Sequence, residues 1–259
     1  MKRIILISAA AAMLLAGGCS SGKSETEIIW LCDKAAGQSL SLFPDASPEL
    51  VASLGLEDAV PSSMSAFLVR KDSKVLLFDT GLGLPDGGIR RGLDSLGLTP
   101  ADVDYLFLTH FHGDHIGGML DAEGTPVYTN AQVYASQPEY DAWMNMPADR
   151  NAQAVRTMNA YSDRMHLFEF GDILPCEVNT IDAAGHTPGH TAFLINDILI
   201  WGDIIHALSI QLEHPEICAT YDMDKEASIN ARKRMIRTAR EQHLLVAGMH
   251  LPEGFLDFR

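Results

Sequence analysis

Residues 109–115 read THFHGDH and directly follow a short apolar stretch, Tyr105 to Leu108, which is typical of a β-strand. Four side chains of metal-binding type stand within six residues: His110, His112, Asp114 and His115. In a loop that leaves a strand, the first two histidines can face one cation while the other two side chains face a second. Because imidazole and carboxylate suit Zn²⁺ and similar divalent metals, this stretch predicts a metal centre at a strand end.

Three further candidate ligands stand at the ends of other apolar stretches. His186 opens the turn GHTPGH (185–190), Asp203 follows LIWG (199–202), and His250 follows LLVAGM (244–249). Each position lies at the end of a predicted strand, where loops build functional sites. The seven side chains together indicate one metal-binding site and not a chance cluster of histidines.

The complete set, HxHxDH followed by a separate His, Asp and His, resembles the ligand pattern of the metallo-β-lactamase superfamily of dinuclear hydrolases. The resemblance implies a first metal held by His110, His112 and His186. It implies a second metal held by Asp114, His115 and His250, with Asp203 bridging the two. Both metals are divalent, zinc by default, although manganese, iron or cobalt also accept these ligands.

Two more residues fit the same resemblance. Asp79, in LLFDTG (76–81), matches the acidic residue after an early strand and is predicted to orient a ligand histidine; a turn-capping role is the alternative. His206, three residues after Asp203, is predicted to support the site, although an ordinary structural histidine fits equally well. The other histidines are read as structural or surface residues: His166, His190, His214 and His243.

The flanking sequences indicate the branch of the superfamily. The segments 200–216, 222–239 and 244–252 are similar to the branch that contains methyl parathion hydrolase and related lactonases. This similarity implies hydrolysis of a small-molecule lactone or carboxylic ester, with phosphotriesters as a side reaction. The two metals would activate a shared water as hydroxide, with Asp203 as the bridge and Asp114 as acceptor of the proton. Residues 253–255 read EGF where that branch often has Phe-Pro-Gly, a departure that concerns the substrate.

Other functions stay open at this stage. A phosphodiesterase, a thioesterase and a β-lactamase are hydrolases of the same fold. A sulfur oxygenase with a single iron would belong to another reaction class, and it would bind one iron per chain and consume oxygen. A lipoprotein that binds metal without turnover is a third class.

The charge of the chain argues against nucleic acid as a partner. The formal net charge is -15 at pH 7, and such a surface repels polyanions. One basic cluster interrupts this pattern, between Arg232 and Arg240, and it is predicted to be the solvated face of a helix with Ala231, Met235 and Ala239 on another face.

The beginning of the chain predicts export. Lys2 and Arg3 precede an apolar run from Ile4 to Leu15, which is typical of a signal peptide over residues 1–18. LLAGGC (14–19) resembles the lipobox of bacterial lipoproteins, so Cys19 is predicted to carry lipid, with residues 19–27 as a flexible tether. We therefore expect an exported protein, in the periplasm or at an outer face, held to a membrane through this anchor; ordinary secretion is the alternative.

The remaining residues, 28–259, predict a single α/β domain: an αββα sandwich of two mixed β-sheets flanked by helices. Strands are expected at 28–31, 66–69, 75–78, 105–108, 132–135, 192–195 and 198–201, and helices near 89–96 and over 225–241. Residues 138–162 predict a helical excursion, either core helices or a lid over the site. A homodimer is reasonable, and Cys32, Cys176 and Cys218 allow one disulfide.

Overall fold

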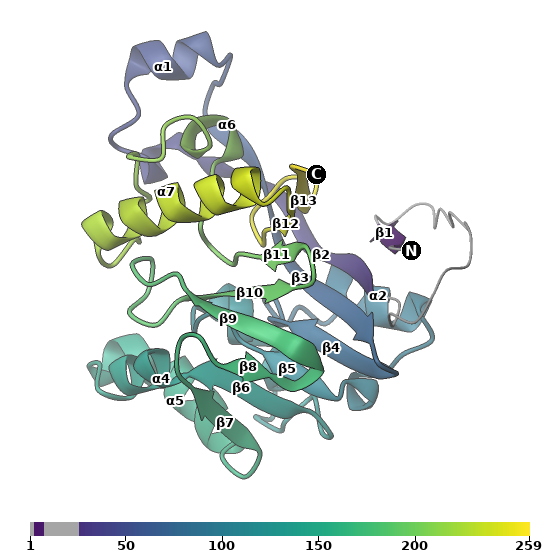
Figure 1. Ribbon diagram of the computed structural model, residues 1–259. Helices are drawn as coiled ribbons and strands as arrows, with labels where there is room; N and C mark the ends of the chain where they lie inside the picture. Colours follow the sequence, from purple (N-terminus) through teal and green to yellow (C-terminus); the bar gives the residue numbers. More distant parts are fainter. Residues whose placement is uncertain (1–2, 8–25) are drawn as a thin grey trace.

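The computed structural model describes residues 3–7 and 26–259 (Figure 1). Cys19 and most of the predicted leader and tether lie outside these residues, so those predictions stay predictions. The second strand begins at Glu27, one residue before the predicted start of the domain, and Thr26 before it is already buried.

The first sheet contains seven strands within the described residues, ordered β1 to β7. They are β1 (Arg3–Ile7), β2 (Glu27–Ser39), β3 (Ala59–Lys71), β4 (Lys74–Phe78), β5 (Tyr105–Phe107), β6 (Gln132–Ser136) and β7 (Met165–Phe168). β2, β3 and β4 are antiparallel neighbours, whereas β4 to β7 run parallel. Parallel strands end at the same edge, so Asp79 after β4 and the HxHxDH stretch after β5 emerge side by side.

The second sheet contains six strands within the described residues, in the order β13-β12-β11-β10-β9-β8. They are β8 (Ile173–Leu174), β9 (Val178–Asp182), β10 (Thr191–Ile195), β11 (Ile198–Ile200), β12 (Leu245–Ala247) and β13 (Phe255–Asp257). β11 and β12 pair in parallel and the other neighbours are antiparallel. The parallel pair sends Asp203 and His250 out at one edge.

The two sheets pack face to face through a layer of aromatic and branched side chains. Phe78, Phe107 and Phe193 form a ring cluster with centroids 5.1–5.7 Å apart, and all three are fully buried. Burying one such side chain contributes about 1.5–3 kcal/mol. This layer fixes the relation of the two sheets, and therefore of the ligands that each sheet contributes.

Helices cover both outer faces (Figure 1). α2 (Gly88–Ser95), α4 (Gln137–Met144) and α5 (Ala148–Ala160) pack on the first sheet, and α7 (Lys225–Glu241) packs on the second. Shorter helices are α1 (Pro48–Ser53), α3 (Gly113–Ile116), α6 (Leu208–Gln211), and the 3-10 turns η1 (Leu40–Leu42), η2 (Pro100–Asp102), η3 (Gly117–Met119) and η4 (Pro175–Glu177). The predicted αββα sandwich is confirmed.

The expected elements lie close to their predicted places. α7 has the predicted bounds, and Asp224 caps it by accepting a hydrogen bond from the Ala227 amide at 3.0 Å. The excursion at 138–162 forms the helical pair α4 and α5. Trp143 and Met158 of this pair are buried in the core on the outer face of the first sheet, which supports the core interpretation of the pair.

One expectation from the sequence differs from the structure, and one open question is answered. The basic cluster of α7 is not wholly solvated: Arg232 is 1% exposed and donates to the carbonyl of Ile204 and to the Asp222 carboxylate. It follows Ala231 and precedes Met235 by one helical turn, and so it shares their inward face. The allowed disulfide is not formed, since Cys32, Cys176 and Cys218 are free thiols.

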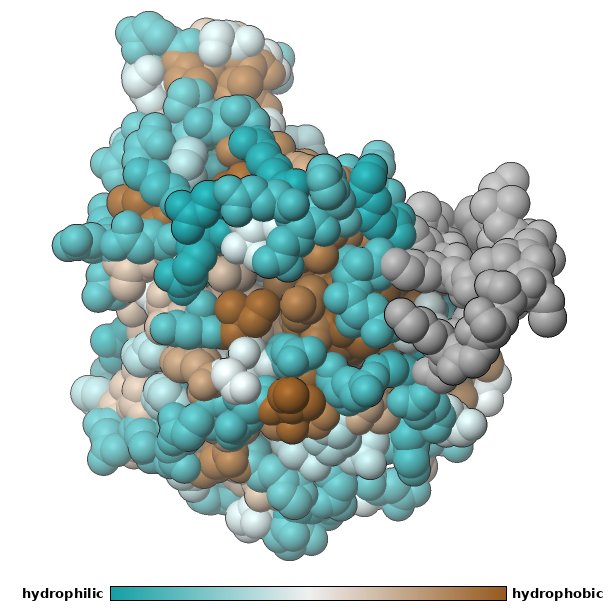
Figure 2. Space-filling view, viewed as in Figure 1, coloured by the Kyte–Doolittle hydropathy of each residue, from teal (hydrophilic) through white to brown (hydrophobic). Residues whose placement is uncertain are grey.

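The surface is mostly hydrophilic on the face shown in Figure 2, apart from an apolar patch over the strands in the middle of the view. In the described ranges, no helix has the length and apolar composition needed to cross a membrane.

Candidate metal centre

All seven predicted ligands meet at one edge of the sandwich. The first sheet contributes four of them, from the loop after β5 and from α3; the second sheet contributes the other three, from the β9–β10 loop and from the ends of β11 and β12. The donor atoms form two groups in which every atom lies within 4.8 Å of the others: His110, His112, His186 and Asp203 in one, Asp114, His115 and His250 in the other.

In the first group, three ring nitrogens converge. His110 Nε2 lies 3.0 Å from His112 Nδ1, which in turn lies 2.9 Å from His186 Nε2. Asp203 Oδ2 completes the group, 3.4 Å from His186 Nε2.

Asp203 also borders the second group, through both of its oxygens. Its Oδ1 lies 3.2 Å from His115 Nε2, and its Oδ2 lies 3.0 Å from His250 Nε2. Asp114 stands at the open side of this group with its Oδ2 3.5 Å from His250 Nε2, and its side chain is 22% exposed. The buried Asp203 carboxylate therefore lies between the two groups, as a bridging ligand must.

Four ligand histidines have their outward-facing nitrogen next to a hydrogen-bond acceptor. His115 Nδ1 lies 2.7 Å from Asp79 Oδ2, His186 Nδ1 lies 2.9 Å from Asp222 Oδ1, and His250 Nδ1 lies 2.7 Å from the Ser63 carbonyl. His110 Nδ1 faces Thr109 Oγ1 at 3.0 Å, and that hydroxyl donates its own proton to Asp79. In the neutral form of each ring, the hydrogen therefore lies on Nδ1. The lone pair of Nε2 is then free and points into the cluster.

These bare lone pairs fit a pair of divalent cations. Buried polar atoms normally have well-formed hydrogen bonds, yet His115 Nε2 and Asp203 Oδ1 form none and only face each other at 3.2 Å. Neutral imidazoles with carboxylates are the ligands that borderline divalent metals prefer. The histidine and aspartate clusters thus provide the ligands of a two-metal site.

The charges of the cluster point the same way. Burial lowers the pKa of His115, but Asp203, Asp114 and Asp79 outweigh burial and leave that pKa well above its ordinary value. Burial raises the pKa of Asp203, but His115, His250 and His206 outweigh it and hold the pKa well below its usual range. Near neutral pH and without metal, Asp203 therefore stays ionised and His115 holds a second proton, which a bound cation would displace.

Asp79 binds residues at both ends of the stretch 109–115. Besides facing His115, its carboxylate accepts hydrogen bonds from the Thr109 amide at 2.9 Å and the Thr109 hydroxyl at 2.7 Å. Its backbone has φ of 61°, a conformation that costs free energy for a residue other than glycine. The structure places Asp79 where the sequence prediction expected it, behind a ligand histidine.

His206 lies as close to the bridging carboxylate as a predicted ligand does. Its Nε2 is 3.0 Å from Asp203 Oδ2, and its ring stacks on that of His250 with centroids 4.9 Å apart. The Tyr221 ring packs against it, with centroids 4.9 Å apart. His206 therefore contacts the site directly.

His190, which the sequence marked as ordinary, holds the bridge in place. Its Nδ1 lies 3.0 Å from the Ala183 carbonyl, and its Nε2 accepts a hydrogen bond from the Asp203 amide at 3.0 Å. Burial, followed by the nearby His186, lowers the pKa of His190 to about 3, so the ring stays neutral and keeps accepting.

Two further residues escaped the sequence analysis. Asp222 binds His186 on one side and the buried Arg232 on the other, where Asp222 Oδ2 lies 3.1 Å from Arg232 Nη2. Glu139 lies between two ligand loops and is described below. Neither residue is near the ligand that it supports in the sequence, so only their contacts in the folded structure reveal their role.

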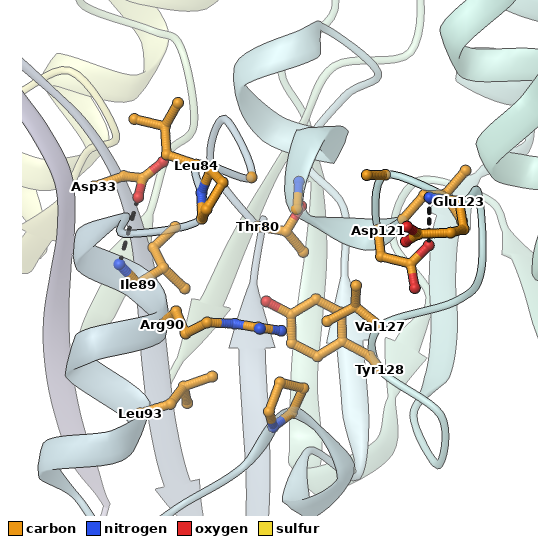
Figure 3. A pocket seen from close by; sticks show the side chains of 16 residues that line it. Asp33, Thr80, Leu84, Ile89, Arg90, Leu93, Asp121, Glu123, Val127 and Tyr128 are labelled. Carbon is orange, nitrogen blue, oxygen red and sulfur yellow. Dashed lines mark hydrogen bonds between the residues drawn. The ribbon is translucent and has the colours of Figure 1, made fainter.

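A separate pocket of about 430 Å³ lies next to the centre, between α2 and the loop after η3 (Figure 3). Figure 3 shows Arg90 reaching across it toward Tyr128, with Asp121 and Glu123 on the far side. Its lining includes none of the seven predicted ligands, and it adjoins the site through Thr80, whose hydroxyl donates to the His115 carbonyl. Gly83, Leu84 and Pro85, in the loop between β4 and α2, form part of its wall.

The chain belongs to the metallo-beta-lactamase superfamily, whose sequence profile matches residues 60–241. Among solved structures, it is 26% identical to the hydrolase AbOPH of the beta lactamase superfamily, with a TM-score of 0.81 over 92% of this chain and 91% of that one. The same fold occurs in AidC, a dizinc quorum-quenching lactonase, which is 23% identical with a TM-score of 0.82 over 92% of both chains.

Curated relatives match over a shorter stretch. A probable metallo-hydrolase of Methanocaldococcus jannaschii is 28% identical over 128 residues, which are 49% of this chain and 50% of that protein. Hydroxyacylglutathione hydrolase of Serratia proteamaculans is 32% identical over 130 residues, 50% of this chain and 42% of that enzyme. The chain thus spans about half the length of the curated relatives it matches.

Proposed function

We propose that this protein is a metal-dependent hydrolase that opens lactones or cleaves carboxylic esters, with phosphotriesters as slower substrates. The observation that carries the proposal is the paired donor set, in which Asp203 faces both groups while Asp114 borders solvent. AidC, which shares the fold along nearly the whole chain, is a quorum-quenching lactonase, and this likeness supports the substrate class.

Two divalent cations at this site, zinc by default, would lower the pKa of a shared water and polarise the carbonyl of an ester. The residues of the chain supply the rest. Asp114 is the carboxylate nearest to solvent and accepts the proton that the attacking water loses. Asp203 keeps the two donor groups together; His190 holds its backbone amide and His206 lies beside its carboxylate.

The test is a panel of substrates given to the zinc-loaded chain from residue 20 onward: lactones, aryl esters, a phosphotriester and a thioester. We expect lactones to turn over fastest and Asp203→Ala to show no turnover above background. If two metals bind but nothing in the panel is hydrolysed, the substrate class is wrong.

A thioester is the second candidate, because hydroxyacylglutathione hydrolases are among the relatives of this chain. Faster turnover of the thioester than of any lactone would favour it. One bound iron with oxygen consumption would instead indicate the oxygenase class.

We also propose that the protein is exported and anchored to a membrane through lipid on Cys19. The support is the sequence of the leader, LLAGGC, at residues 14–19. In a bacterial host, labelling with a fatty-acid analogue is expected to mark the wild-type chain and not Cys19→Ser. Equal labelling of both chains would contradict the anchor.

A further inference from the structure

A buried carboxylate lies between two of the loops that carry the ligands. Glu139, in the first turn of α4, is 1% exposed. Its partners among the described residues are four uncharged donors, and no lysine or arginine of these residues forms an ion pair with it. Burial is the main influence on this carboxyl, and it raises the pKa of Glu139 although all four hydrogen bonds lower it.

The four hydrogen bonds divide between the two loops and α4. Oε1 accepts from the Phe111 amide at 2.9 Å and from Trp143 Nε1 at 2.6 Å. Oε2 accepts from the Thr187 hydroxyl and the Gly189 amide, both at 2.8 Å. Phe111 stands between the ligands His110 and His112, and Thr187 directly follows the ligand His186. One carboxylate thus binds residues that directly adjoin three ligands of the first group.

The helix itself does not need this carboxylate. Ser136 already caps α4 by accepting the Glu139 amide hydrogen bond at 3.2 Å. In the sequence pattern S-x-x-E, the glutamate usually returns to the amide of the capping residue. Here both carboxylate oxygens point to the ligand loops instead, so helix capping does not account for them.

The contact between α4 and the second loop is also close. The Ser136 hydroxyl donates to the Gly189 carbonyl at 2.7 Å, and a Cβ on Gly189 would lie 2.0 Å from the Glu139 amide nitrogen. Glycine at 189 therefore allows the loop to approach the first turn of α4, which brings it within reach of the Glu139 side chain.

We propose that Glu139 is a positioning residue that sets the spacing between the HxHxDH loop and the 185–190 loop, and so holds His110 and His112 against His186. The proposal rests on the metal centre described under the proposed function. It concerns how that centre is assembled, not which ester it cleaves.

Glu139→Gln tests this role with little change of shape. A glutamine amide presents one oxygen and one NH₂ group, so two of the four donors would face another donor. The first donor group should then bind its cation less well, because its ligands come from both loops. The second group takes only its HxHxDH ligands from these loops, and its other ligand, His250, lies elsewhere.

The measurement is titration of the metal-free protein with Zn²⁺ against a competing chelator, with the melting temperature recorded in parallel. In Glu139→Gln we expect one of the two binding steps to weaken about 10- to 100-fold, the range typical of residues that orient ligands. The other step should change by less than about threefold.

Asn151→Ala is the matched structural control. Asn151 is buried in the same helical pair and donates to the carbonyls of Trp143 and Met146, but to neither ligand loop. It should lower the melting temperature without weakening either zinc step. Wild-type affinity at both steps in Glu139→Gln, or equal losses in the two variants, would overturn the proposal.

If Glu139→Gln does not fold, Thr187→Val removes one donor to Oε2 while preserving the shape of the side chain, and the same weakening of a single step is expected. Wild-type binding in that variant would overturn the proposal. Wild-type protein that fails to bind two zinc ions would refute the metal centre itself, whereas binding without hydrolysis would refute only the substrate class.

Discussion

The ligand His186 shows how a residue outside the ligand set prepares a side chain for metal. Its Nδ1 faces Asp222, and Asp222 is held in turn by Arg232 and by the Ala219 amide. Burial opposes ionisation of Asp222, but the hydrogen bond with His186 and the nearby His206 and Arg232 hold its pKa well below its usual range. The carboxylate is therefore charged, and it fixes both the ring orientation and the tautomer of His186.

Asp222→Asn should weaken the binding of one zinc ion about 10- to 100-fold, because the amide NH₂ must face either His186 Nδ1–H or the donors on the other side. Chelator competition measures the affinity. Asp224→Asn, two residues along, is the control, since asparagine also caps helices well and Asp224 caps α7. Equal affinity in the Asp222 variant and wild type would show that this carboxylate does not orient the ligand.

At the scale of elements, the parallel strand pairs and the helical pair matter most. β4 with β5, and β11 with β12, bring Asp79, the HxHxDH stretch, Asp203 and His250 to one edge. α4 and α5 then brace this edge from outside: Trp143 of α4 lies 5.6 Å from the His112 ring between centroids. The pair belongs to the core and touches the site at the same time.

Tyr161, directly after α5, ties this pair to the turn after α3. Its hydroxyl donates to the Met119 carbonyl at 2.7 Å and accepts from the Tyr128 amide at 3.1 Å. Tyr161→Phe should lower the free energy of unfolding at pH 8 by about 1–3 kcal/mol, because both backbone groups lose a buried partner. Urea unfolding measures this difference.

The same variant tests the pH dependence. Burial raises the pKa of Tyr161 from 10.0 to about 12. Below pH 10 the phenol is protonated in both states, so the stabilisation is complete; between pH 10 and 12 the unfolded chain loses the proton first, and the stabilisation declines. The gap in unfolding free energy between wild type and Tyr161→Phe should therefore shrink across this range. A constant gap would contradict the assigned pKa.

At the scale of the whole molecule, the centre joins the two sheets. Ligands from the first sheet and from the second share Asp203, so a bound cation links both halves of the sandwich. Without a cation, the buried His115 Nε2 and Asp203 Oδ1 form no well-shaped hydrogen bond, which costs free energy. Metal should thus stabilise the fold as well as serve the reaction.

Chelation should therefore lower the melting temperature. Zinc at about 100 times its dissociation constant stabilises by about 2.7 kcal/mol. For a domain of this size, that corresponds to roughly 5–10 °C. Differential scanning fluorimetry with EDTA, and then with zinc restored, measures the shift. The melting temperature of Asp203→Ala should change little on either addition. A wild-type melting temperature that EDTA does not lower would argue against bound metal.

The sequence by itself determined the class of fold and the ligand set. Apolar stretches and helix caps are short-range features of a sequence. The stretches predicted the strand positions, and the cap Asp224 with the helical pattern after it predicted the bounds of α7. The HxHxDH stretch and the three separate ligands could likewise be predicted, because each of these four segments follows a strand or opens a tight turn and together they resemble the ligand pattern of a known family.

Only the tertiary structure decided what surrounds these ligands. His250 is oriented by the Ser63 carbonyl, His186 by Asp222, and the two ligand loops are joined by Glu139. Arg232 is buried, although the cluster of basic residues on α7 predicts a solvated helix face. The physical reason is that hydrogen-bond partners are chosen by which segments pack together. Residue type and local periodicity carry no record of a neighbour that is distant in the chain.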